Sequence, residues 1–291
     1  MARFLSVTLG GLSGGFVYAA VALSLVLIWR ATRVLNFAQG AMAMFTAYLG
    51  YKVIEHGASY WVALLVALAA GLVMGAVVER VLVRPVENGP PLNAVVVTLG
   101  VFIVVEALAG MFFGGTPHRY PTHFSNVNYS FGDVSALAPF DIWIIVAVAL
   151  VAVLLGALFR YTDVGLRMRA AAFEGEVARM LGVRVGRMLT LGWALAAVIG
   201  ALAAVLVSPN VPLSPTSMDA VFVFGFTGAV IGGLDSPVGA LIGGVGIGLL
   251  LNYVAAYWGG DLQTLAALAV LVLVLMVKPS GLFSTTASRR V

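Results

Sequence analysis

Long apolar stretches constrain this chain more than any other feature of its sequence. Nine windows that are almost free of charged residues end at charged or turn-forming residues, over about 5–29, 35–53, 60–79, 92–113, 141–159, 189–208, 219–233, 237–257 and 262–277. Most approach the roughly 20 residues that a helix needs to cross about 30 Å of hydrocarbon. Of the 291 residues, 62% are hydrophobic and only 10% are charged, which excludes a soluble globular domain. The sequence therefore predicts an all-α, polytopic transmembrane helical bundle.

Two of these windows differ from a simple membrane span, one by its length and the other by its position near the N-terminus. The window 219–233 has only about 15 residues, so we expect a short or broken helix there and about eight to nine spans in total. The first window follows Arg3 and could be a secretory signal, but its uncharged run from Phe4 to Trp29 exceeds the apolar part of a signal peptide. We therefore expect a membrane span.

A charged loop, 160–188, interrupts the apolar sequence. Its charged residues are Arg160, Asp163, Arg167, Arg169, Glu174, Glu176, Arg179, Arg184 and Arg187. If this loop is cytoplasmic and the spans alternate, thirteen of the Lys and Arg residues lie inside and three, Arg3, Lys52 and Arg119, lie outside. This asymmetry predicts an external N-terminus and a cytoplasmic C-terminus, with 114–140 as the main external loop.

The middle of the charged loop predicts a short helix. Residues 170–181 are rich in helix formers, and Gly182 follows them at a position where glycine often ends a helix. Such an amphipathic helix fits either the membrane surface or a groove on a cytosolic protein, and the spacing does not choose between them.

A few polar and helix-breaking residues interrupt the spans. Asn36 and Gln39 begin the second window and Glu106 lies in the fourth, while Gly232 and Gly233 open a turn between two apolar windows. A carboxylate at membrane depth suggests a functional site, and irregular backbone there must face protein or a water-filled path. For Glu106, pore and structural roles stay open. For Asn36 and Gln39, hydrogen bonding between helices is the simpler interpretation.

Pairs of small residues recur at a spacing of four within the apolar windows. These pairs are Gly10/Gly14, Gly11/Gly15, Gly71/Gly75, Gly110/Gly114, Gly228/Gly232, Gly239/Gly243 and Gly244/Gly248. Such pairs let helix backbones approach closely, so we favour close packing over a role in motion.

The sequence also argues against several other classes of protein. Its two lysines, Lys52 and Lys278, do not follow a phosphate-binding glycine pattern, and no Ser/His/Asp set or HExxH pattern indicates an enzyme. Cysteine is absent, and His118 and His123 lack the further ligands of a metal site. Basic residues flank apolar spans, which argues against a nucleic-acid partner despite the net charge of +4.

Several separated motifs resemble one known family. They are Tyr18-Ala19, Val34-Leu35-Asn36-Phe37-Ala38-Gln39-Gly40, Ala47-Tyr48, Gly165-Leu166-Arg167-Met168-Arg169-Ala170, Ala178-Arg179-Met180-Leu181-Gly182-Val183, Gly232-Gly233, Pro237-Val238-Gly239-Ala240 and Lys278-Pro279-Ser280-Gly281-Leu282-Phe283. In this order they resemble the H-type permeases of branched-chain amino-acid ABC importers. The resemblance extends over nearly the whole chain.

The resemblance implies a single permease domain over 1–291 in the cell's inner membrane. It also implies a second related permease, two cytosolic ATPases that use ATP and Mg, and an external solute-binding protein. By this analogy the ATPase-docking residues are Arg169, Ala170, Glu174, Ala178, Leu181 and Gly182. No cofactor or metal is expected on this chain itself.

We therefore interpret the chain as a non-catalytic permease subunit that moves branched-chain or other hydrophobic amino acids by alternating access. The residues expected along the translocation path are Asn36, Gln39, Gly40, Glu106, Gly232 and Gly233. One rival is a nucleotide-independent transporter or channel for a small polar solute such as an amide, urea or a sugar. Another is an assembly protein whose loop only recruits a partner.

Overall fold

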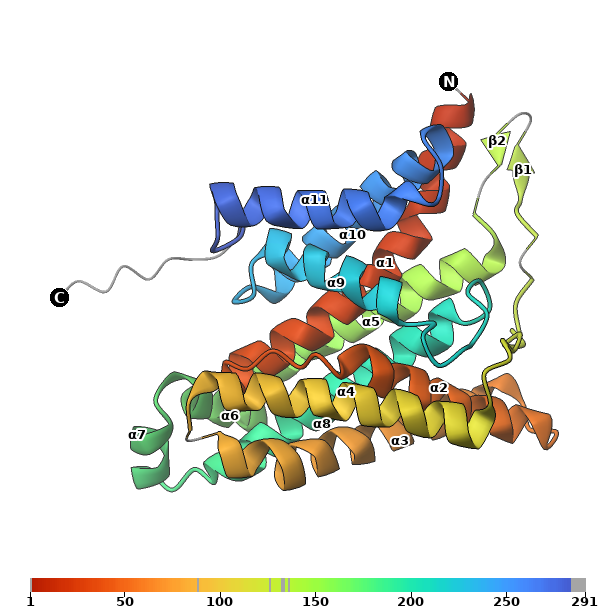
Figure 1. Cartoon of the computed structure of the whole chain (residues 1–291). Coiled ribbons are helices and arrows are strands. Elements are labelled where there is room, and N and C mark those ends of the chain that lie inside the picture. The colour runs from red at the N-terminus through yellow and green to blue at the C-terminus, as the bar shows by residue number, and fades with distance from the viewer. Residues whose placement is uncertain (1, 88, 126, 132–133, 136, 284–291) are drawn as a thin grey trace. The chain divides into compact units, whose positions relative to one another are not determined.

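The computed structural model describes residues 2–87, 89–125, 127–131, 134–135 and 137–283, and this part of the chain is mainly helical (Figure 1). Its α-helices are α1 (Ala2–Thr32), α2 (Gln39–Glu55), α3 (Tyr60–Val77), α4 (Pro91–Phe113), α5 (Pro139–Tyr161), α6 (Asp163–Phe173), α7 (Gly175–Met180), α8 (Val185–Val207), α9 (Asp219–Gly232), α10 (Pro237–Tyr257) and α11 (Leu262–Val277). A π-helical turn (Val78–Val83) and a 3₁₀ turn (Arg84–Val86) extend α3. Two short antiparallel strands, β1 (Ser130–Phe131) and β2 (Val134–Ser135), pair between α4 and α5.

The predicted all-α membrane bundle is confirmed. Within the described residues, each of the nine apolar windows contains a helix, and α1, α3 with its extension, α4, α5, α8 and α10 are long and apolar enough to cross a membrane. Helix α9 has 14 residues, which confirms the short helix expected in the seventh window. Parts of the expected external loop, and Arg289 and Arg290 near the C-terminus, lie outside the described residues.

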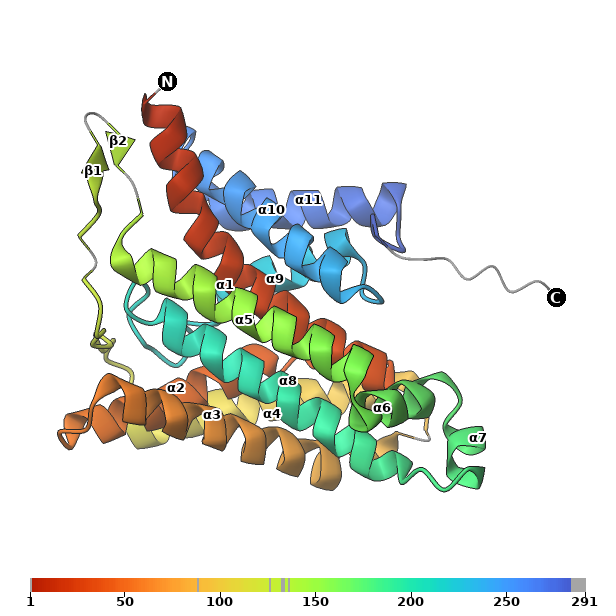
Figure 2. The same cartoon turned by 180° about the vertical axis from the view of Figure 1, so that it is seen from behind.

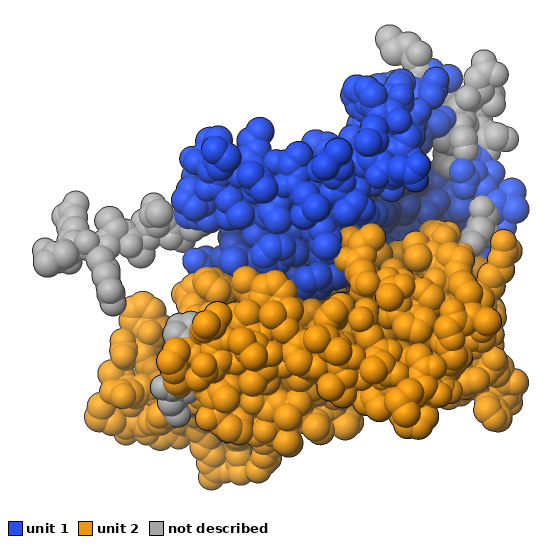
Figure 3. Space-filling view, in the orientation of Figure 1, with its two compact units in different colours: residues 1–26, 124–148, 222–291 blue, residues 27–123, 149–221 orange. Residues whose placement is uncertain are grey.

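Residue contacts divide the chain into two compact units (Figure 3). Unit 1 comprises residues 1–26, 124–148 and 222–291, and unit 2 comprises residues 27–123 and 149–221. Three of the four boundaries between them fall inside α1, α5 and α9, and the fourth, at 123/124, lies between α4 and β1. The single permease domain expected over 1–291 stays a prediction.

In unit 1, helix backbones touch where glycines remove the side chains. Helix α10 lies along α1 (Figure 2), and a Cβ atom added to Gly248 would overlap the backbone of Gly15. Similarly, Gly244 lies against the backbone of Ala19, and Gly228 of α9 lies against Gly244. These contacts agree with the close packing expected from small residues spaced by four.

In unit 2, helix α8 forms the centre and packs against α2 and α3. Trp193 of α8 and Tyr48 of α2 are fully buried. A Cβ atom on Gly75 of α3 would lie 2.6 Å from the carbonyl oxygen of Trp193, so α3 and α8 also approach through a glycine. At one end of this unit, the backbones of His118 and Leu213 exchange hydrogen bonds of 2.9 and 2.8 Å.

Candidate functional site: the charged loop and the polar contacts of the helices

The charged loop 160–188 folds into two helices, so the single helix expected over 170–181 is wrong. Helix α6 ends at Phe173 and α7 begins at Gly175, with Glu174 between them in an extended conformation (φ −148°, ψ 87°). Gly175 favours a break because glycine loses more conformational freedom in a helix than other residues. The start of α6 is fixed by Thr162, whose hydroxyl accepts a 3.0 Å hydrogen bond from the Gly165 amide.

The end of α7 agrees with the prediction made for Gly182. This residue has φ +83°, a left-handed conformation that glycine adopts without a steric cost. The amide of Gly182 donates to the Arg179 carbonyl at 3.0 Å, and that of Val183 donates to the Ala178 carbonyl at 2.9 Å. The turn satisfies carbonyls at the helix end and directs the chain into α8.

Apolar side chains project from this loop into solvent. Phe173, Met180 and Leu181 are 90%, 80% and 78% exposed, and Val177 is 47% exposed. We call these four residues the apolar patch. Large apolar side chains this exposed on a charged loop are typical of a binding surface for a partner.

The six residues expected to dock an ATPase differ in burial. Exposed members are Arg169, Ala170, Glu174, Leu181 and Gly182. In contrast, Ala178 is 3% exposed and packs in a small core with Ala171, Val185 and Leu189. Ala178 therefore anchors α7 on α8, and any part it has in docking is indirect.

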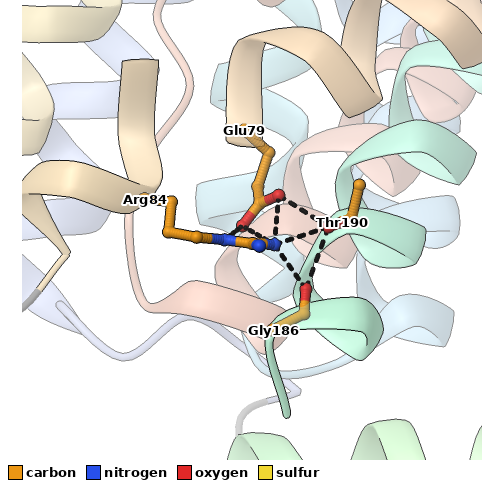
Figure 4. A network of polar contacts seen from close by, with 4 residues as sticks. All are labelled: Glu79, Arg84, Gly186 and Thr190. Carbon is orange, nitrogen blue, oxygen red and sulfur yellow. Dashed lines mark hydrogen bonds and ion pairs between the residues drawn. The ribbon is translucent and has the colours of Figure 1, made fainter. Parts of the chain in front are cut away.

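A buried polar network lies where the charged loop enters α8 (Figure 4). Glu79, in the π-helical turn, is 1% exposed and forms an ion pair of 2.8 Å with Arg84. Arg84 also donates to the Gly186 carbonyl and to the Thr190 hydroxyl, both at 2.6 Å. The Thr190 hydroxyl in turn donates to Glu79 at 2.8 Å. The network joins the extension of α3 to the first turns of α8, and we call it the polar clamp.

Sequence reasoning missed the polar clamp. It counted Arg84 as one of several cytoplasmic cations and gave Glu79 no role. The available signal was a glutamate and an arginine five residues apart at the end of an apolar window, which a π-helical turn brings together. Their third partner, Thr190, lies 111 residues from Glu79 in the sequence.

Asn36 and Gln39 lie together inside unit 2, each 1% exposed. The Asn36 amide donates to the Gln39 side-chain oxygen at 3.0 Å, and the Gln39 amide donates to the Ala196 carbonyl of α8 at 2.9 Å. Gly40 is buried beside them. These bonds join the start of α2 to α8, and a place for the three residues along a translocation path stays a prediction.

Glu106 forms a carboxyl pair with Asp219. Their side chains are in hydrogen-bonding contact, while the Oε1 atom of Glu106 is buried with no partner among the described residues. The pair therefore offers polar atoms at membrane depth in unit 2.

Gly232 and Gly233 form the predicted turn of unit 1. Helix α9 ends at Gly232, Gly233 has φ +93°, and α10 begins at Pro237. The Ser236 hydroxyl accepts a 3.0 Å hydrogen bond from the Gly239 amide, which caps α10. The structure thus places these glycines in unit 1 and the other expected path residues in unit 2. Within the described residues, no group of three or more His, Cys, Asp and Glu side chains is placed to hold a metal ion.

Comparison with known proteins agrees with this architecture. Residues 7–277 match the profile of the family described as "Branched-chain amino acid transport system / permease component". The chain is 28% identical over 298 residues to LivH of Escherichia coli K12, a high-affinity branched-chain amino acid transport system permease protein. The alignment covers 96% of this chain and 95% of LivH. It is 26% identical over 294 residues to the permease BraD of Pseudomonas aeruginosa, with 96% and 95% coverage.

A solved structure supports the fold at lower identity. It is described as a metal-chelate type ABC transporter in an inward-facing conformation, with a TM-score of 0.53 at 16% identity over 92% of this chain and 86% of that one. At this identity the likeness concerns the fold alone. The match over residues 7–277 establishes that this chain belongs to the family of branched-chain amino acid transport permease components.

Proposed function

We propose that this chain is the permease subunit of an ATP-binding-cassette importer that moves branched-chain or other hydrophobic amino acids by alternating access. The chain itself is non-catalytic and binds no cofactor, and two cytosolic ATPases hydrolyse ATP with Mg²⁺. A second related permease and an external solute-binding protein complete the importer in the inner membrane. The excess of Lys and Arg around the charged loop supports a cytoplasmic loop and C-terminus and an external N-terminus.

The observation that carries this proposal is the apolar patch on the charged loop. Its exposed side chains suit a groove on a soluble partner, and the surrounding arginines and glutamates keep the loop out of the hydrocarbon. The matching family profile is described as a transport-system permease component, and the relative LivH is named as a transport system permease protein. An ATPase that closes on ATP would move α7, and the buried Ala178 would pass that movement to α8.

The translocation path is a further part of the proposal. We expect it to include Asn36, Gln39, Gly40, Glu106, Gly232 and Gly233. The carboxyl pair of Glu106 and Asp219 suits the ammonium group of an amino acid, because a charge inside a membrane requires an opposite partner.

The experiment replaces Leu181 in the apolar patch with aspartate. Because Leu181 is 78% exposed, we expect Leu181→Asp to leave the fold intact. Losing an apolar anchor typically costs about 2 kcal/mol of binding, and about 1.4 kcal/mol is tenfold in affinity, so we expect at least a tenfold loss of co-purifying ATPase. Leu181→Met serves as the matched control and keeps the partner. If Leu181→Asp retains the ATPase and normal amino-acid uptake, the docking role of the patch is wrong.

A further inference from the structure

A cavity of about 450 Å³ lies in unit 2 between the end of α1, helix α6 and the start of α8. Its volume falls within the range of about 300–1,000 Å³ that is usual for ligand sites. Of the four residues of the apolar patch, Phe173 lines the cavity and the other three do not. None of the residues expected along the translocation path lines it.

The charge of the cavity wall selects an anion. Arg30, Arg33 and Arg169 line it, and no aspartate or glutamate occurs among its described lining residues. Three guanidinium groups around one space favour a phosphate, which arginine binds through paired N–H donors. A free amino acid fits poorly, because its ammonium group would have no carboxylate partner in the cavity.

The remaining wall of the cavity is apolar. Leu27, Phe159 and Met188 line it together with small alanines. The guanidinium of Arg30 lies 5.5 Å from the centre of the Phe159 ring, so one side of this ring faces a cation. A ligand that matches this wall has an anionic head and a hydrocarbon part.

The backbone of Arg33 gives an independent reason to regard its side chain as functional. Arg33 follows the last residue of α1 with φ +57°, and its amide donates to the Trp29 carbonyl at 2.8 Å. Glycine is the residue usually found in this left-handed position after a helix, since a side chain is strained there. An arginine kept in a strained position points to a role for its guanidinium.

We propose that this cavity binds an anionic phospholipid. Its phosphate is held by Arg30, Arg33 and Arg169, and the first part of an acyl chain lies along Leu27 and Phe159. Basic pockets between membrane helices are suited to anionic lipid headgroups. Since Arg30 belongs to α1 and Arg169 to α6, the bound lipid joins a membrane span to the charged loop. An effect on ATPase coupling would rest on the function proposed above, whereas lipid binding itself does not.

The test measures lipid retention by the purified full chain. The protein is exchanged into nanodiscs of equal phosphatidylcholine and phosphatidylglycerol, and retained lipid is quantified by native mass spectrometry. We expect phosphatidylglycerol to be enriched at least fivefold over phosphatidylcholine. The variant Arg30→Gln/Arg33→Gln should lose this enrichment. The matched control Arg184→Gln/Arg187→Gln removes the same charge from exposed loop positions outside the cavity and should keep it.

A second variant separates binding from folding. Arg33→Gly removes the guanidinium and also the backbone strain, so its melting temperature should equal or exceed that of the wild type while lipid enrichment falls at least threefold. Equal enrichment in the cavity and control variants overturns the proposal, as does no preference for phosphatidylglycerol. If inorganic phosphate displaces the lipid at equal concentration, the site recognises a free anion and the lipid proposal fails. The proposal also fails if the cavity variants release a co-purifying ATPase but keep the lipid.

Discussion

Helices α9 and α10 of unit 1 and helices α3 and α8 of unit 2 are held together in different ways. In unit 1, glycines such as Gly228 and Gly244 bring backbone against backbone, so no side chain can adjust at the contact. In unit 2, Gly71 and Gly75 provide a similar approach along α3, but the end beside the charged loop is fastened by the polar clamp. Polar contacts can break and reform with little change in volume. Two backbones in contact at a glycine have no side chain that could change rotamer to relieve a clash. This difference suggests that unit 1 packs rigidly and that the clamp is the adjustable contact.

The largest effect is expected for Gly244→Leu. A side chain at this position would overlap the backbone of Ala19, which cannot move aside without displacing α1. Overpacking usually costs about 1–3 kcal/mol of folding stability, and we expect a clash with backbone to cost at least as much as the upper end of this range. We expect the variant to be almost absent from membranes by immunoblot. Gly246→Leu is the control, because nothing lies within 4 Å of a Cβ atom there. Equal abundance of the two variants would refute backbone contact in unit 1.

Breaking the polar clamp should have the next largest effect. Glu79→Ala leaves the partly buried Arg84 without its ion pair, and breaking a buried pair costs about 3 kcal/mol at the lower end of the usual range. The double variant Glu79→Ala/Arg84→Ala removes both charges and should recover part of this loss. Thermal unfolding in detergent measures the two single variants, Glu79→Ala and Arg84→Ala, and the double variant. If the two single losses simply add in the double variant, the clamp does not act as a unit.

Gly182→Val tests the loop that the clamp borders. A valine at φ +83° is strained by about 1–2 kcal/mol, although the space around Gly182 is open. We expect α7 to be misplaced, amino-acid uptake to fall at least tenfold, and the protein to stay inserted and abundant. Gly182→Asn should be milder, because asparagine tolerates this conformation. Normal uptake by the valine variant would show that transport does not depend on the conformation at the end of α7.

The smallest effect is expected at Glu87, beside the clamp. Burial and repulsion by Glu79 raise the pKa of Glu87, so the folded protein holds this proton more tightly than the unfolded chain. The contribution of this group to stability is fully present below the ordinary pKa of a glutamate and is lost as the pH rises through the raised pKa. Glu87→Gln should therefore stabilise the protein at pH 8 by about 0.5 kcal/mol or less and have no benefit at about pH 4. An equal change in melting temperature at both pH values would exclude this electrostatic cause.

The sequence predicted the fold better than it predicted the contacts between helices. Apolar windows indicate membrane helices because the hydrophobicity of a segment is a property of its own residues. Glycines such as Gly182 and Gly233 mark turns because they adopt left-handed backbone conformations. The break at Glu174 was missed because the alanines and other helix formers of 170–181 outweigh the single glycine, Gly175, that favours a break. The polar clamp depends on a π-helical turn and on Thr190, which is distant in sequence, and no local pattern reports such a contact.

Uptake of radiolabelled leucine by proteoliposomes tests whether this chain carries amino acids only when separate ATPases drive it. The chain is reconstituted with its second permease and ATPases, with the solute-binding protein on the external side, and ATP is supplied at the cytoplasmic face. We expect rapid uptake with ATP, almost none with a non-hydrolysable analogue, and almost none from the chain without ATPases. Full-rate uptake by the chain alone, without any ATPase, would contradict this expectation.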